Sequence, residues 1–323
     1  MPAIFTVTFN PCIDLNTCVE ELRPEIKLRC SEPLVQPGGG GINVARAIRK
    51  LGGHANALFP CGGANGQRLK TLLEEEEVGF IAVNIPGNTR ENIIVTERST
   101  GNQYRLNMPG PQLDTAVCNA LLSAIGSQPR LDYLVVSGSL APGISPGIFQ
   151  DIKAIVQRKK SVLVVDTSGE ALKKAVDCKP DLVKLSVHEL ASLMRSEDLS
   201  SLTDIEAAAR RLSDTGIRSI VISLGARGAF WISGNEHGRI RAPMVKTVST
   251  VGAGDSMVAG IVMRLSAGRS LPEAVEYGVA CGSATTMQAG TTLCNKEDVE
   301  RIVLQIKDKT NRHEKDTGHR GRA

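Results

Sequence analysis

The residues best suited to chemistry lie in a short stretch, 249–256, that ends with one carboxylate. Gly252, Ala253 and Gly254 precede Asp255 there, and an apolar run, 257–262, follows. The glycines allow a tight turn with exposed N–H groups, and the apolar run predicts a buried helix whose first turn carries Asp255. Free N–H groups at the start of a helix attract anions. The stretch therefore predicts an anion site that contains a carboxylate.

This stretch alone supports two hypotheses for Asp255. The carboxylate could cap its helix by accepting a hydrogen bond from a free N–H group, which is a common role for Asp at such positions. Alternatively, a phosphoryl group docks on the N–H groups while Asp255 takes a proton from an attacking hydroxyl. The rest of the chain has to decide between them.

Four consecutive glycines, 38–41, form a second notable stretch and lead directly into a predicted helix. Ile42, Ala45, Ile48 and Leu51 recur there at three-residue steps. Because each glycine adds entropy to the unfolded chain, close approach of a ligand to the backbone explains the run better than a flexible turn. The run lacks the GxGxxG order of a dinucleotide site, and the chain has no P-loop lysine motif. These absences argue against a dinucleotide-dependent oxidoreductase.

The remaining pattern predicts an α/β fold with a mainly parallel central sheet covered on both faces. A first strand over 4–8 is ended by Asn10 and Pro11, and Asp14 follows, where strand ends in such sheets present ligand-binding groups. The further expected strands, separated by segments of helical period, are 57–59, 80–83, 133–137, 162–166, 182–184 and 219–223. Several end in polar or small residues, which predicts a polar rim where the ligand lies.

Two segments, about 17–36 and 90–108, interrupt the alternation of strands and helices. They contain four expected short strands, at 18–19, 27–30, 92–97 and 103–107. We expect these strands to form one small antiparallel sheet, inserted into the α/β body as a lid over the site.

Composition limits the class of protein. The chain has 323 residues, a net charge of +4, 3% aromatic residues and eight cysteines without a CxxC pair. No basic-aromatic interleaving suggests nucleic acid, and no apolar run is long enough to span a membrane. We expect a cytoplasmic protein with one domain over 1–308 and a disordered tail over 309–323.

Four motifs appear in an order that resembles the pfkB, or ribokinase-like, family of carbohydrate kinases. They are Gly-Gly-Gly-Gly-Ile-Asn-Val-Ala-Arg-Ala, Lys-x-x-x-x-Glu at 184–189, Ser-Leu-Gly-x-x-Gly at 223–228, and Ser-Thr-Val-Gly-Ala-Gly-Asp-Ser at 249–256. The resemblance covers residues 3–308 and is strongest to the minor, ribokinase-like 6-phosphofructokinases of bacteria. It implies a ribokinase-like three-layer α/β/α fold with a small antiparallel lid.

The resemblance also implies a role for individual residues. Asp255 would be the catalytic base, and the N–H groups of Gly252, Ala253 and Gly254 the anion hole. The implied sugar-phosphate ligands are Asp14, Gly39, Gly40 and Asn43 for hydroxyls, and Lys27, Arg90 and Ser139 for the phosphate. The implied ATP-site residues are Lys184, Ser186, Ser223, Leu224, Gly225, Ala226, Arg227, Gly228, Thr247, Val279 and Ser283.

Two metal ions are implied as well. Mg²⁺ would accompany ATP, with Glu189 acting on it indirectly, although Ser186 stands where the family usually has Asn, which puts the local water network in question. A monovalent cation, K⁺, would be held largely by backbone carbonyls of the residues Ser249, Val251, Thr285, Gln288, Gly290 and Thr292.

We therefore expect an ATP-dependent glycolytic kinase that converts fructose 6-phosphate to fructose 1,6-bisphosphate. A 1-phosphofructokinase or a tagatose-6-phosphate kinase would use the same residues, and a sugar-phosphate or nucleotide sensor without catalysis is a more distant alternative. A homodimer through the lid is also expected, because four short strands leave an apolar face and open edges.

Overall fold

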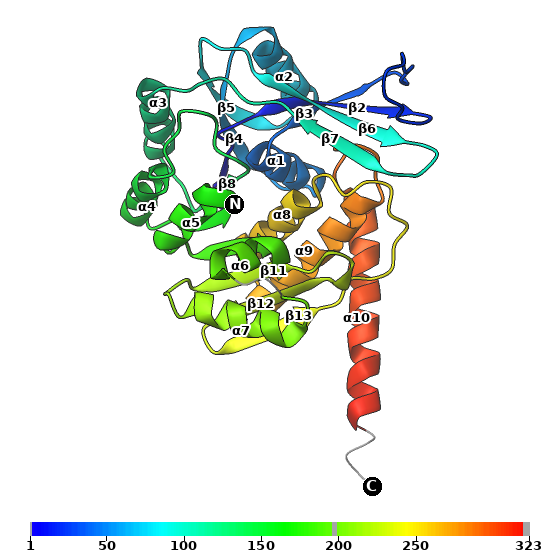
Figure 1. Ribbon diagram of the computed structural model, residues 1–323. Helices are drawn as coiled ribbons and strands as arrows, with labels where there is room; N and C mark the ends of the chain where they lie inside the picture. The colour runs from blue at the N-terminus through cyan, green and yellow to red at the C-terminus, as the bar shows by residue number, and fades with distance from the viewer. Residues whose placement is uncertain (1, 196–198, 319–323) are drawn as a thin grey trace.

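A nine-stranded central sheet with helices on both faces forms the body of the protein. The structure is a computed structural model and describes residues 2–195 and 199–318. The strands, in spatial order, are β13 (Glu236–Ile240), β12 (Ala229–Ser233), β11 (Ser219–Ser223), β10 (Leu182–Ser186), β9 (Val162–Asp166), β8 (Tyr133–Ser137), β1 (Ile4–Val7), β4 (Asn56–Cys61) and β5 (Gly79–Asn84). Seven consecutive strands, from β11 to β5, pair in parallel, while β12 pairs antiparallel with both β11 and β13. The predicted three-layer α/β fold is confirmed (Figure 1).

Two sets of helices cover the two faces of this sheet. One set is α1 (Gly40–Lys50), α8 (Ala253–Ser266), α9 (Leu271–Thr286) and α10 (Lys296–Gly318), and the other is α3 (Thr115–Gly126), α4 (Ile148–Lys159), α5 (Gly169–Asp177), α6 (Val187–Met194) and α7 (Leu202–Ser213). Ile4 packs in the first core and Phe5 in the second, because successive strand residues point to opposite faces. Helix α2 (Gly63–Glu75) packs with α1 and β4.

A separate four-stranded sheet packs against α2 and projects from the body above α8 and α9 (Figure 1). Its strands, in spatial order, are β3 (Leu34–Gly38), β2 (Cys12–Val19), β6 (Arg90–Glu97) and β7 (Gln103–Asn107). We call it the lid sheet. The predicted inserted sheet is thus present, but three details of the prediction are wrong.

First, β2 and β6 pair in parallel, so the lid sheet is mixed and not purely antiparallel. The reason is that β2 follows β1 and β6 follows β5, and these two strands leave the central sheet in the same direction. Second, residues 27–30 form no strand and belong to an exposed connection, 20–33, in which the charged sequence around Pro24 offers little to bury. Third, the first lid strand is longer than the predicted strand at 18–19, because β2 begins at Cys12 and includes Asp14.

Helix α10 continues to Gly318, well into the segment expected to be disordered. Polarity suggested disorder, but no glycine or proline interrupts residues 296–317, and charged residues such as Lys and Glu are good helix formers. The rest of that segment, 319–323, lies outside the described residues. Within 2–195 and 199–318, no helix is both long and apolar enough to cross a membrane.

Helices α8 and α9 pack unusually close to each other, and this contact fixes the position of the Asp255 turn. A Cβ atom added at Gly260 would lie 2.6 Å from Sγ of Cys281 and 3.1 Å from Cα of Gly278. Both distances are shorter than ordinary van der Waals contact, so only glycine fits at position 260 without a shift of the helices.

We expect Gly260→Ala to lower the free energy of unfolding by about 1–3 kcal/mol, because the added methyl overpacks the interface of α8 and α9. Gly126→Ala is the matched control, because a Cβ there, at the end of α3, meets no atom within 4 Å. This control should gain about 0.5–1 kcal/mol from reduced unfolded-state entropy. Urea denaturation measures both, and equal stability of the two variants would contradict the packing argument.

Candidate active site

The carboxylate of Asp255 lies where α8, α1 and β8 converge. Asn43 of α1 donates from Nδ2 to Oδ2 of Asp255 (3.0 Å), and Ser137 at the end of β8 donates from Oγ to Oδ1 (3.3 Å). The helix begins after Gly252, whose φ of 75° is in the left-handed region, and it has no side-chain cap. The described contacts of Asp255 are therefore to other elements, which argues against the helix-cap hypothesis.

The surroundings of Asp255 tune it as a proton acceptor. Burial and the nearby carboxylate of Asp166 raise the pKa of Asp255 to about 6, although Asn43, Lys184 and Ser137 act in the opposite direction. A group with this pKa is largely deprotonated at neutral pH, and it is a stronger base than an ordinary Asp, whose pKa is about 3.9.

A buried ion pair lies next to this base. Nζ of Lys184 donates to Oδ1 (3.1 Å) and Oδ2 (3.4 Å) of Asp166, at the ends of β10 and β9. Burial alone would lower the pKa of Lys184, but Asp166 and Glu189 raise it, so the ammonium stays charged. A Cβ at Gly254 would lie 2.8 Å from this Nζ. The positive charge therefore sits against the first turn of α8.

A cavity of about 460 Å³ opens beside the start of α8, within the usual size of a small-molecule site. Seven of the eleven residues implied for ATP line it, together with Ala253 and Gly254; the seven are Ser223, Gly225, Ala226, Gly228, Thr247, Val279 and Ser283. The other four lie elsewhere. Leu224 packs in the core against α7, Arg227 is exposed, and Lys184 and Ser186 lie at the end of β10.

Ser186 and Glu189 form a capping box at the start of α6. Oγ of Ser186 accepts from the backbone N–H of Glu189 (3.2 Å), and Oε2 of Glu189 accepts from the N–H of Ser186 (2.6 Å). Ser186, which replaces the Asn usual in the family, thus serves as a helix cap and fixes the Glu189 carboxylate near Lys184.

The four-glycine turn is explained by the protein's own packing. Gly39 has a φ of 111°, and a Cβ at Gly40 would overlap Oγ of Ser137. A Cβ at Gly38 would lie 2.6 Å from Oδ2 of Asp14. The sequence interpretation attributed these glycines to close approach of a ligand, and the structure adds a second reason for them, because they bring the start of α1 against β2 and β8.

Asp14 is buried on β2, and side chains of three elements bond to it. Asn92 donates from Nδ2 to Oδ1 (3.1 Å), Cys12 donates from Sγ to the same oxygen (3.2 Å), and Thr291 donates from Oγ1 to Oδ2 (3.1 Å). Asp14 therefore contacts Thr291, which lies between Gly290 and Thr292, two of the residues implied for the monovalent cation.

The three residues implied for the substrate phosphate are only partly brought together. Arg90 donates to the carbonyl of Asn10 (3.0 Å), and Nδ2 of Asn10 donates to Oγ of Ser139 (3.3 Å). Arg90 and Ser139 thus flank the same residue. Lys27 lies in the exposed connection between β2 and β3, where the described part of the chain shows no hydrogen bond or ion pair for it.

The residues implied for K⁺ come from two segments that meet at the carboxyl end of α9. The N–H groups of Val248 and Ser249 both donate to the carbonyl of Thr286. Carbonyls at the end of a helix carry partial negative charge, so this meeting point suits a cation. The full set, Ser249, Val251, Thr285, Gln288, Gly290 and Thr292, lies in or beside these two segments.

Sequence reasoning missed several residues of the site. Ser137 and Asp166 were recognised only as polar strand ends, and Thr291 was passed over between Gly290 and Thr292. Ser137 and Asp166 could have been identified from their positions, because the carboxyl ends of parallel strands meet at one edge of the sheet, where ligands bind. Nothing local to Thr291 indicates its bond to Asp14.

Comparison with known proteins agrees with this geometry. The family model of pfkB family carbohydrate kinases matches residues 6–298. The chain belongs to the pfkB family. In this pfkB-family carbohydrate kinase, the matched residues run from within β1 to the first turn of α10.

Two curated relatives of this pfkB-family chain are phosphofructokinases. It is 40% identical over 308 residues to the ATP-dependent 6-phosphofructokinase isozyme 2 of Escherichia coli (strain K12), covering 95% of this chain and 99% of the relative. It is 31% identical over 307 residues to the 1-phosphofructokinase of Bacillus subtilis (strain 168), covering 94% and 98%. The crystal structure of Escherichia coli phosphofructokinase-2 in complex with potassium has a TM-score of 0.90 at 39% identity, covering 95% and 100%.

With Asp255 as the base that the sequence predicts, phosphoryl transfer should fall with decreasing pH below about 6, because protonation of its carboxylate would remove the proton acceptor. We expect kcat to decrease about tenfold per pH unit below that value. Ser137→Ala removes a hydrogen bond that lowers the pKa of Asp255, so its acidic limb should lie at higher pH. Profiles of kcat at saturating substrates test both points, and identical limbs in the two proteins would contradict the assignment.

Proposed function

We propose that this kinase transfers the γ-phosphoryl group of ATP to fructose 6-phosphate and so forms fructose 1,6-bisphosphate. The observation that carries the proposal is the Asp255 carboxylate, held by Asn43 and Ser137 between the nucleotide-sized cavity and the lid sheet. The 40% identity with a 6-phosphofructokinase over nearly the whole of both chains supports the choice of substrate.

In this proposal the O1 hydroxyl of the sugar attacks the γ-phosphorus in line, and Asp255 accepts its proton. The N–H groups of Gly252, Ala253 and Gly254 stabilise the charge on the transferred group, and the Lys184 ammonium adds a positive charge beside them. Phosphoryl transfer needs little covalent help from a protein, so positioning and electrostatics supply most of the acceleration.

The substrate would lie between the lid sheet and the start of α1. Asp14, Asn43, Gly39 and Gly40 would contact its hydroxyls, and their placement around the glycine turn is compatible with this role. Lys27, Arg90 and Ser139 would bind the phosphate that the substrate already carries. A guanidinium suits a phosphate because it offers several N–H donors in a plane.

The ions would act on the nucleotide side of the site. Mg²⁺ bound to ATP would neutralise phosphate charge, and the Glu189 carboxylate, held in place by the capping box, would suit contact with it through water. K⁺ would lie at the carboxyl end of α9, close to the loop that precedes the anion hole.

A kinase for fructose 1-phosphate is the second candidate, supported by the 31% identical relative from Bacillus subtilis. A tagatose-6-phosphate kinase would use the same residues. Neither alternative changes the role proposed for Asp255, because all three substrates are phosphosugars.

A coupled assay of ADP release tests the proposal with fructose 6-phosphate, fructose 1-phosphate, tagatose 6-phosphate and unphosphorylated sugars, with and without K⁺. We expect the highest kcat/KM with fructose 6-phosphate, and a loss of about two to four decades of kcat in Asp255→Asn. Asp114→Asn is the matched control, because it changes the same group at the cap of α3, where Asn serves equally well. No turnover with any sugar would contradict the kinase proposal and favour a sensor.

We also propose a homodimer through the lid sheet. Large apolar side chains are exposed on this sheet and its adjoining connections, namely Leu22, Ile26, Leu34, Tyr104, Leu106 and Met108. Such a cluster on a small sheet with open edges is typical of an interaction site.

Leu106→Glu should convert a dimer to a monomer, because it places a charge within the apolar face of the lid sheet. Leu304→Glu is the control, because Leu304 is similarly exposed but lies on α10. Light scattering at micromolar concentration gives the mass. A monomeric wild-type protein would contradict the proposed dimer.

A further inference from the structure

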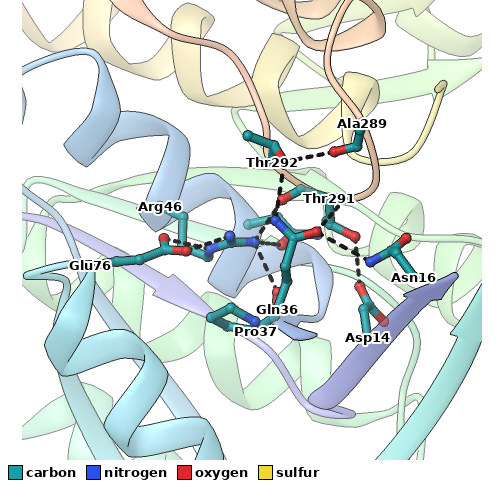
Figure 2. Close-up of polar contacts among 10 residues, drawn as sticks. Asp14, Asn16, Gln36, Pro37, Arg46, Glu76, Ala289, Thr291 and Thr292 are labelled. Carbon is teal, nitrogen blue, oxygen red and sulfur yellow. Dashed lines mark hydrogen bonds and ion pairs between the residues drawn. The ribbon is translucent and has the colours of Figure 1, made fainter. Parts of the chain in front are cut away.

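Arg46 of α1 is a charged side chain that lies fully inside the protein. Its Nε and Nη2 donate to the two carboxylate oxygens of Glu76, at 2.8 and 2.6 Å. Its Nη1 donates to three further oxygens, the carbonyls of Pro37 (2.9 Å) and Thr291 (3.1 Å) and Oδ1 of Asn43 (3.1 Å). Figure 2 shows the guanidinium between Glu76 on one side and Pro37 and the 289–292 loop on the other.

Stability alone does not explain this arrangement. Burying a guanidinium costs several kcal/mol of desolvation, and well-packed apolar residues often replace a buried ion pair without loss of stability. The bidentate pair with Glu76 accounts for Nε and Nη2 only. All three bonds of Nη1 go to groups that border the kinase site, which indicates a role there.

The first of these bonds sets the orientation of the Asn43 amide. Because Nη1 of Arg46 donates to Oδ1 of Asn43, the amide nitrogen has to point the other way, and it donates to Oδ2 of Asp255 (3.0 Å). A flipped amide would place its NH₂ group against the guanidinium, two donors facing each other. Arg46 thus selects the rotamer in which Asn43 bonds to the proposed base.

The second bond fixes the 289–292 loop against the lid sheet. The carbonyl of Thr291 accepts from Arg46, and its N–H donates to Oε1 of Gln36 on β3 (2.8 Å). Its hydroxyl then donates to Oδ2 of Asp14 (3.1 Å), and Gln36 also donates to Oγ1 of Thr292 (3.2 Å). Figure 2 shows this chain of contacts from Arg46 to Asp14.

We propose that Arg46 is a positioning residue for phosphoryl transfer, which holds the Asn43 amide toward Asp255 and the 289–292 loop toward Asp14. One guanidinium therefore helps to position both the proposed base, Asp255, and the carboxylate of Asp14 on the sugar side. The inference rests on the proposed role of Asp255 as the base.

The test separates kcat from nucleotide binding. In the double variant Arg46→Met with Glu76→Leu, both charges are removed, so neither is left buried without its partner. We expect kcat to fall about 10- to 100-fold and KM for fructose 6-phosphate to rise. The Kd for ATP should stay within about twofold, because Arg46, Asn43, Asp14 and Thr291 do not line the nucleotide cavity.

Arg49→Met is the matched control. Arg49 lies on the same helix one turn later and forms an ion pair with Glu77, but it is partly exposed and has no described contact with Asn43 or Thr291. Its kcat should stay near that of the wild type. Arg46→Lys keeps the positive charge but lacks the planar guanidinium that bonds Glu76, Asn43 and Thr291 together. It should therefore keep the stability of the wild type but have a lower kcat.

The pH profile gives a readout that a merely structural role would not change. The groups that face Asp255 are Asn43, Ser137, Asp166 and Lys184. Loss of the Asn43 bond should move the acidic limb of kcat to higher pH in the Arg46 variants but not in Arg49→Met. Unchanged kcat and limb in the double variant, or equal losses of kcat and ATP affinity, would overturn the proposal. If Asp255→Asn remains fully active, the proposed function itself fails, whatever the Arg46 variants do.

Discussion

Two buried carboxylates of like charge, Asp255 and Asp166, lie close enough to repel each other, and several side chains around them offset this repulsion. Burial, and then the repulsion from Asp166, raise the pKa of Asp255. Lys184 offsets it by binding Asp166, and Asn43 and Ser137 donate to Asp255. These three partners come from three different elements, β10, α1 and β8, so the sheet edge and α1 must both be correctly placed against α8 to hold Asp255 in position.

Local chemistry made part of this site predictable. The glycines before Asp255 and at 38–41, the parallel strands and the polar strand ends are all properties of short segments, and each was found where the sequence placed it. The nucleotide residues were also mostly brought together, since seven of them line one cavity. The resemblance to the pfkB family supplied their order along the chain.

The features that could not be predicted from the sequence are contacts between residues that lie far apart in the chain. The parallel pairing of β2 with β6 follows from the directions of β1 and β5, and no single hairpin shows it. Arg46 looks like an ordinary polar residue of an amphipathic helix, yet its bond to Thr291 spans 245 residues. Ser186 appeared to be a loss from a family motif, whereas it caps α6.

Strand β3 connects the lid sheet directly to the glycine turn at the start of α1. Leu34, an exposed apolar residue of the lid sheet, lies at one end of this five-residue strand, and Gly38, the first glycine of the turn, lies at the other. Asn43 follows within α1. If the lid face binds a second copy, subunit association and order at the glycine turn become thermodynamically linked. A ligand that orders the turn would then tighten the dimer by the same free energy with which dimerisation tightens the ligand.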